Sequence, residues 1–385
     1  MNLPPLYPIT GADQKLSLSE QVLRFAGAGF PLVQFRGKPM KVGDQWRELR
    51  KALSQASEYG GWPLIVVNDR ADLAVLAAAE NLVPWGLHLG QTDLPASDAV
   101  RLPGLENIHL GASTHNSDEW LSANETCDHA GVGPLRATST KRDHDEAIGF
   151  NGLSKGCSIL RSRGIAPIAI GGLTLDDALP CFQAGAASLA MTNALSPSIL
   201  SERESQLTEY LWQAQKLKYA VRPILSKSRG VVIVGGSGTG KTTLAEHLAR
   251  RMDLMAIDLD SQIARRADCS ITEIFSKGEL LFRNLELECL PECMEQTSVL
   301  ALGAGAWQQE AVRELVKKSN WDVLWLAETP LIAWERVRMD PARPLANDRT
   351  EFMQRWRSRL YEWSTLPSLL PLGRTPEELA QILVP

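Results

Sequence analysis

The residues best suited to chemistry lie just beyond the middle of this 385-residue chain, in a glycine-rich segment. An apolar run at 231–234 leads into a G-x-x-x-x-G-K-T pattern at 235–242, and residues typical of a helix follow. In such a segment backbone N–H groups surround phosphates, the lysine reaches the β- and γ-phosphates, and the threonine hydroxyl binds Mg²⁺. The pattern therefore predicts a site for ATP and Mg²⁺ made by Gly235, Gly238, Gly240, Lys241, Thr242 and Thr243.

The composition narrows the classes of function. The formal net charge of −5 argues against a nucleic-acid binder, and no uncharged apolar run approaches the length of a membrane span. The N-terminus lacks the basic and apolar regions of a secretory signal, and the six cysteines are scattered. We therefore expect a cytoplasmic protein with reduced cysteines and small-molecule substrates, without nucleic-acid or membrane partners.

The first half of the chain alternates short apolar runs with polar or helical stretches. This alternation is typical of parallel strands joined by helices, and eight repeats in about two hundred residues favour a (β/α)₈ barrel over an open doubly wound sheet. The expected strands are 6–9, 32–35, 64–67, 85–88, 108–111, 130–133, 168–171 and 188–191.

Polar residues follow most of these strands, at the end where a barrel builds its active site. Arg36, Lys38 and Lys141 supply positive charge, while Asp69 and Asp93 supply oxygen ligands for Mg²⁺. Cations and Mg²⁺ around one point fit a pyrophosphate leaving group. Gly171-Gly172 after the seventh strand suits a second phosphate, so the pocket is expected to join two phosphorylated substrates.

The same segments carry a specific family resemblance. The N-terminal half resembles thiamine-phosphate synthase over about residues 5–200, with motifs in the family's order at 33–38, 67–74, 88–95, 111–115, 131–134, 138–141 and 169–173. The family joins an aminopyrimidine methyl pyrophosphate to a thiazole phosphate and releases pyrophosphate. Small barrels of this kind often associate, so the resemblance is compatible with a homo-oligomer.

The resemblance implies a role for each rim residue. Gln34 would contact the pyrimidine, and Asp69 and Asp93 would bind Mg²⁺. The pyrophosphate would be held by Arg36, Lys38, Asn68, Ser113 and the catalytic Lys141, and the thiazole phosphate by Thr138, Thr140 and Gly172. The pattern departs from the family at 136–137 and 191–193, near the thiazole phosphate. A thiazole tautomerase of the same superfamily is the alternative, although the full pyrophosphate set argues against it.

The second half is expected to be a separate P-loop NTPase-type parallel α/β domain. A polar helix at 201–217 and a basic linker at 218–229 separate the two halves. We assign residues 1–205 to the barrel, 206–228 to a helix and linker, and 229–385 to the P-loop domain. Asp258 and Asp260 alternate on an expected strand, and Arg283 and Glu286 lie one helical turn apart, where they can pair.

This half resembles shikimate kinase throughout. The resemblance implies that Asp260, Arg283, Gly305 and Arg357 hold the acceptor, with Asp260 accepting its proton, that Asp258 and Thr242 serve Mg²⁺, and that Arg343 is a catalytic lid residue. Ala304 replaces the middle glycine of the family's Gly-Gly-Gly. Three options follow: a shikimate kinase, a kinase for another small alcohol such as a phosphorylated thiamine precursor, or a nucleotide-binding regulatory module.

Overall fold

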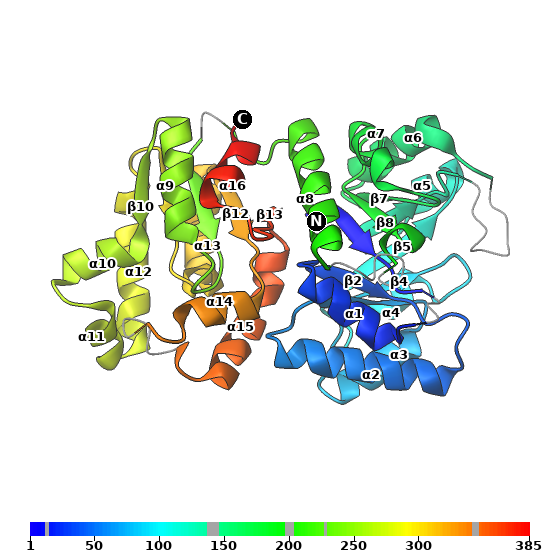
Figure 1. Ribbon diagram of the computed structural model, residues 1–385, viewed down its shortest axis with the longest axis horizontal. Coiled ribbons are helices and arrows are strands. Elements are labelled where there is room, and N and C mark those ends of the chain that lie inside the picture. The colour runs from blue at the N-terminus through cyan, green and yellow to red at the C-terminus, as the bar shows by residue number, and fades with distance from the viewer. Residues whose placement is uncertain (12–14, 137–145, 197–203, 227–228, 341–345) are drawn as a thin grey trace. The chain divides into compact units, whose positions relative to one another are not determined.

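The computed structural model describes residues 1–11, 15–136, 146–196, 204–226, 229–340 and 346–385. The chain forms two compact units (Figure 1). The first comprises Met1–Glu58 and Trp62–Arg222, and the second comprises Pro223–Pro385 with Tyr59–Gly61. No helix in these described ranges is both long enough and apolar enough to cross a membrane.

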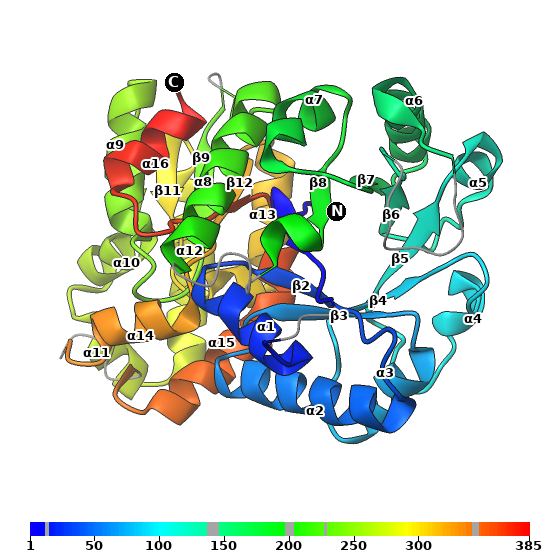
Figure 2. The same cartoon turned by 45° about the vertical axis from the view of Figure 1, so that its right-hand side comes forward.

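The first unit is an eight-stranded parallel barrel. Its strands run in the order β1-β8-β7-β6-β5-β4-β3-β2, and Figures 1 and 2 show its helices around the outside of the strands. The strands are β1 Leu6–Pro8, β2 Leu32–Phe35, β3 Leu64–Asn68, β4 Gly86–Leu89, β5 His109–Thr114, β6 His129–Val132, β7 Ala166–Ile170 and β8 Ser188–Met191. The predicted fold class is confirmed, with strand ends shifted by up to three residues.

The barrel closes between its first two strands by a single bridge. Ile9 pairs in parallel with Gln34 just beyond the end of β1, and the Thr10 N–H donates to the Gln34 carbonyl over 2.9 Å.

The helices of the first unit are α1 Leu18–Gly27, α2 Val42–Glu58, α3 Ala71–Ala79, α4 Ala96–Ala99, α5 Ser117–Ser122, α6 Gly149–Ser162, α7 Ala178–Gln183 and α8 Glu204–Val221, with short 3-10 helices η1 Leu175–Asp177 and η2 Asn193–Leu195.

Helix α8 runs further than its sequence indicates. It continues to Val221 and packs on α7 and α1, so the predicted linker at 218–229 was wrong for residues 218–221. The end of the helix is held because the Lys218 ammonium donates to the Leu3 carbonyl and because Arg222 donates to the carbonyls of Gly185 and Ala186. Basic residues that resemble a linker in the sequence therefore fasten the helix to the barrel.

The second unit is a five-stranded parallel sheet in the order β10-β11-β9-β12-β13. The central strand β9, Val231–Val234, is fully buried, and the glycine-rich segment leaves its carboxyl end. The other strands are β10 Met255–Asp258, β11 Ser298–Ala301, β12 Asp322–Leu326 and β13 Ser368–Leu369.

Helices cover this sheet, and α9 and α16 pack against each other (Figure 1). The helices are α9 Lys241–Met252, α10 Leu259–Ala267, α11 Ile271–Ser276, α12 Glu279–Cys293, α13 Glu310–Ser319, α14 Pro330–Val337, α15 Arg349–Ser364 and α16 Pro376–Leu383, with the 3-10 helix η3 Ala306–Gln308.

Candidate active sites

The carboxylates of the barrel rim lie in contact. Asp69 follows β3 with φ of 62°, and its Oδ2 lies 2.5 Å from the Lys38 ammonium. Asp93 accepts the Gly90 N–H over 2.7 Å, and its carboxyl group lies within hydrogen-bonding reach of the Asp69 carboxyl group. The structure therefore brings together three predicted site residues from the ends of β2, β3 and β4.

The electrostatics of this pair suit a divalent cation. Burial raises the pKa of Asp93, and the negative charge of Asp69 raises it further. Burial also opposes ionisation of Asp69, but the Lys38 ammonium keeps the pKa of Asp69 below its ordinary value. Two touching carboxylates repel when both are ionised, and a cation between them relieves that repulsion. The pair fits Mg²⁺, which takes one or two carboxylates and keeps several waters.

Other predicted ligands lie on the same rim. Because β2, β3, β4 and β5 are consecutive parallel neighbours, their carboxyl ends place Gln34, Arg36, Asn68 and Ser113 along one edge. Gln34 is buried and donates to the Tyr7 hydroxyl over 3.3 Å. The Arg36 backbone is held by Thr10, while its guanidinium makes no ion pair with another described residue. The rim thus offers a cationic group for an anionic ligand.

Arg136 organises the glycine loop at 171–172, where the sequence predicts a second phosphate. In the sequence this residue appeared only as a departure from the family pattern. Its guanidinium donates to the Gly172 carbonyl over 3.1 Å and pairs with Asp177, while its N–H donates to the Gly171 carbonyl. A Cβ at Gly171 would lie 2.5 Å from Pro134 Cα, so only glycine permits this close approach. Arg136 therefore holds the glycine loop in place. Thr138, Thr140 and Lys141 lie outside the described residues.

The glycine-rich segment of the second unit wraps into a loop before α9. Gly235, Gly238 and Gly240 have φ values of 152°, 82° and 92°, a region that favours glycine. The Lys241 ammonium donates to the Gly236 carbonyl over 2.8 Å, and Thr243 follows in the first turn of α9.

A hydrogen bond joins the first turn of α9 to the end of β10. The Thr242 hydroxyl donates to Asp258 Oδ2 over 2.6 Å. This hydroxyl and carboxylate fit an Mg²⁺ ion that shares nucleotide phosphate oxygens.

The expected alternation of Asp258 and Asp260 along a strand was wrong. β10 ends at Asp258, whose Oδ1 caps α10 by accepting the Ser261 N–H over 3.0 Å. Asp260 therefore lies in the first turn of α10. Asp258 thus ends the strand and Asp260 lies in the helix that follows, so the two carboxylates do not alternate along one strand.

The ion pair of Arg283 and Glu286 lies beside the turn that contains Gly303 and Gly305. Arg283 Nη1 lies 2.8 Å from Glu286 Oε2, which confirms the predicted pair. Glu286 has no exposed surface, and burial raises its pKa to about 7, with the Asp260 charge contributing. A Cβ at Gly303 would lie 2.5 Å from Asp260 Oδ1, and one at Gly305 would lie 2.3 Å from Arg283 Nη2. The two glycines thus make room for the acid and the arginine.

Helix α15 brings to this cluster an arginine, Arg359, that the sequence motif does not indicate. Burial lowers the pKa of Arg359 to about 10, and the nearby Arg283 charge adds to this effect. The positive charge of Arg359 in turn lowers the pKa of Glu286 and so opposes the effect of burial. Arg357, two residues away, has an exposed side chain. Motif matching missed Arg359, although its spacing of four from Arg355 places both on one helical face. Arg343 lies outside the described residues.

Comparisons with known proteins agree with this division of the chain. The family model for thiamine monophosphate synthase matches residues 6–195, and that for shikimate kinase matches residues 237–371. A shikimate kinase of Staphylococcus aureus (strain MRSA252) is 39% identical over 121 residues, which are 31% of this chain and 69% of that protein.

Two solved structures are also similar. Thiamine phosphate pyrophosphorylase from Pyrococcus furiosus is 25% identical, with a TM-score of 0.45, over 57% of this chain and 96% of that chain. Shikimate kinase from Acinetobacter baumannii in complex with shikimate is 29% identical, with a TM-score of 0.37, over 40% of this chain and 89% of that chain. The chain therefore belongs to the shikimate kinase family through residues 237–371, and its residues 6–195 match the family model for thiamine monophosphate synthase.

Proposed function

We propose that the barrel joins an aminopyrimidine methyl pyrophosphate to a thiazole phosphate, releasing pyrophosphate and forming thiamine phosphate. The observation that carries this proposal is the contact of Asp69 with both Lys38 and Asp93 on the rim. A cation and a carboxylate pair at one point suit a leaving group that departs with several negative charges.

The proposed reaction needs positioning and charge neutralisation more than a protein base. The bond between the pyrimidine methylene carbon and the pyrophosphate oxygen breaks, and a bond from that carbon to the thiazole nitrogen forms. The electron-rich aminopyrimidine carries the transient positive charge. Lys38, Arg36 and Lys141 would neutralise the departing oxygens, and Mg²⁺ at Asp69 and Asp93 would supply further charge.

For the second unit we propose ATP-dependent phosphorylation of a hydroxyl on a small acid, with shikimate as the first acceptor to test. Asp260 would accept the hydroxyl proton, and Arg283 would pair with the carboxylate of the acceptor. The cluster of Asp260, Arg283 and Arg359 beside Gly303 and Gly305 supports an anionic acceptor over an uncharged thiazole alcohol.

Two assays on the full chain test these proposals separately. The first measures thiamine phosphate and pyrophosphate from the two barrel substrates. The second measures ADP with ATP and shikimate, or with ATP and phosphorylated or unphosphorylated thiamine precursors. Shikimate-dependent ADP supports the kinase proposal. Phosphorylation of a thiamine precursor without phosphorylation of shikimate would show that the precursor is the acceptor. Intact ATP binding without transfer to any alcohol would indicate a nucleotide-binding module.

The Gly305→Ala variant is expected to raise the KM for the acceptor about tenfold or more while leaving the KM for ATP nearly unchanged. The added methyl would lie 2.3 Å from Arg283 Nη2 and force the guanidinium away, which removes a charge-assisted hydrogen bond. Steady-state kinetics with each substrate varied measures the effect. Ala304→Gly is the matched control and should not raise either KM; equal KM values for Gly305→Ala and wild type would contradict the arrangement.

Arg359→Ala is expected to raise the KM for the acceptor about tenfold, because Arg359 lies with Arg283 at the cluster. Arg357→Ala is the matched control on the same helix, since its side chain is exposed. If the Arg357 variant were the one to lose acceptor affinity, the family motif would assign the role correctly, and the proposed role of Arg359 in acceptor binding would be wrong.

A further inference from the structure

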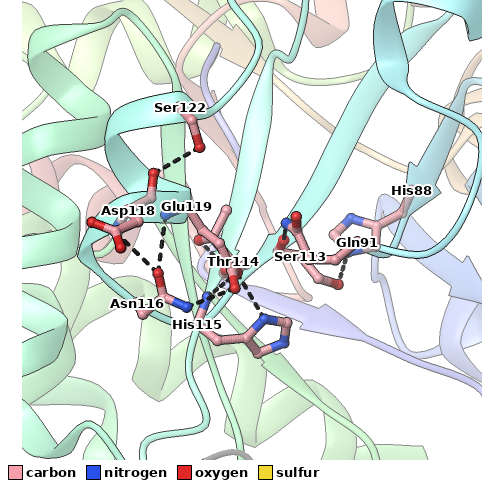
Figure 3. A network of polar contacts seen from close by, with 10 residues as sticks. His88, Gln91, Ser113, Thr114, His115, Asn116, Asp118, Glu119 and Ser122 are labelled. Atoms are coloured by element: carbon pink, nitrogen blue, oxygen red, sulfur yellow. Dashed lines mark hydrogen bonds and ion pairs between the residues drawn. The ribbon is translucent and has the colours of Figure 1, made fainter.

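A buried histidine pair lies beneath the anion-binding rim of the barrel. His129 on β6 has no exposed surface, and its Nε2 lies 3.5 Å from Nδ1 of His88 on β4, with the rings stacked at 5.6 Å between centroids. His88 Nε2 lies 3.1 Å from the Ser113 hydroxyl oxygen on β5, and Figure 3 shows these two side chains directed toward each other. The chain of contacts runs from the barrel interior to a residue expected to bind pyrophosphate.

Gly111 makes this arrangement possible. A Cβ at Gly111 would lie 2.1 Å from His129 Nε2 and 2.6 Å from His88 Nδ1. Any side chain at this position of β5 would therefore separate the two rings. Gly111 lies within strand β5, so no turn conformation requires a glycine there. The close approach of the two histidine rings explains why this position carries no side chain.

The surroundings of His129 determine which of its nitrogens carries the proton. Burial lowers its pKa to about 3, with the His88 charge adding to the effect, so the ring is neutral and has one N–H. His129 Nδ1 is buried and has no hydrogen-bond partner among the described residues. Because an orphaned buried N–H is rarer than an unused acceptor, the proton belongs on Nε2 and points to His88 Nδ1.

This assignment sets the direction of the remaining hydrogen bonds. Because His88 Nδ1 accepts the hydrogen bond from His129, the proton of His88 lies on Nε2, which donates it to the Ser113 oxygen. The Ser113 hydroxyl can then direct its own proton only away from His88. With the opposite tautomers, the Ser113 hydroxyl would donate its hydrogen bond to His88 Nε2. Only its lone pairs would then face an anion.

We propose that His129 is a positioning residue that acts through His88 to make the Ser113 hydroxyl a hydrogen-bond donor to the leaving pyrophosphate. This inference rests on the proposed pyrophosphate site of the barrel and names the residue behind one of its donors. His129 does not touch the substrate, so its effect is expected on anion affinity and on the tautomer of His88.

The test uses isothermal titration of the full chain with inorganic pyrophosphate and Mg²⁺. His129→Leu and Ser113→Ala should each weaken binding about tenfold, and the double variant should be no weaker than Ser113→Ala, because both changes remove the same hydrogen bond. His129→Gln, which keeps a donor toward His88, should recover most of the affinity. Additive losses, or unchanged binding in His129→Leu, would overturn the proposal.

Nitrogen NMR of the wild-type chain gives a second readout that needs no variant to fold. Both His129 and His88 should appear as neutral rings protonated on Nε2; protonation of His129 on Nδ1 would overturn the proposal. Failure of the wild type to bind Mg²⁺-pyrophosphate would instead overturn the proposed function of the barrel, and this inference with it. Normal wild-type binding with no response to His129→Leu would overturn this inference alone.

Discussion

The Asp69→Asn variant is expected to lose pyrophosphate release from the barrel substrates by about 10²–10³-fold, a typical loss for one group that stabilises transition-state charge. Asp69 contacts both Lys38 and Asp93, so the change removes one of the two carboxylates offered to Mg²⁺. Asparagine tolerates the φ of 62° at this position, so the backbone should stay in place. Pyrophosphate release across a Mg²⁺ titration measures the loss.

Asp72→Asn is the matched control for this variant. Asp72 lies three residues further along the chain, is exposed, and pairs with Arg70 on the helix surface. Its replacement should change turnover less than twofold, as for most surface ion pairs. Circular dichroism of the same preparation, compared with the wild-type chain, reports whether the barrel is folded. An Asp69→Asn protein with wild-type turnover and an unchanged Mg²⁺ requirement would show that this carboxylate does not take part.

The Lys241→Met variant is expected to lose ATP-dependent phosphoryl transfer by a factor on the order of 10³, since the reaction depends almost wholly on positioning and charge stabilisation. Methionine keeps the length and apolar stem of the lysine and removes only its charge and donors. The ammonium lies over the loop on the Gly236 carbonyl, where it can turn to the β- and γ-phosphates. ADP formation at saturating acceptor measures the loss.

Lys317→Met provides the control, because Lys317 is an exposed residue in the last turn of α13. Thiamine phosphate formation by the barrel should be unaffected in both variants, since each unit has its own core. Retention of transfer in Lys241→Met at more than a tenth of the wild-type rate would contradict the proposed role of the loop lysine.

Much of the architecture follows from local sequence patterns. Strands and helices alternate in the first half because short apolar runs can be buried only in a parallel sheet covered by helices, and the structure confirms eight such strands. The conformation of the glycine-rich loop could also be predicted from the sequence, because its strand, glycines and helix are contiguous and the required φ values belong to glycine. The pair of Arg283 and Glu286 depends only on helical spacing, which is also local.

Other features depended on contacts between distant segments. Helix α8 reaches Val221 because Lys218 and Arg222 meet carbonyls of the barrel, and no local pattern reveals those acceptors. The Arg136 contact with Asp177 joins a loop to the 3-10 helix η1, forty-one residues further along the chain. His129 and His88 meet only because β6 and β4 flank the same glycine of β5.

The sequence by itself determined the two folds, the glycine-rich loop and the polar rim, because strand ends and loop glycines constrain the conformation of the residues beside them. The tertiary structure alone decided which side chains turn inward. On α15, Trp356 fills the space beside Gly236, where a Cβ would lie 2.1 Å from its ring, and this packing sets the rotation of the helix. That rotation brings Arg359 to the ion-pair cluster and leaves Arg357 exposed, because residues two apart on a helix face different directions.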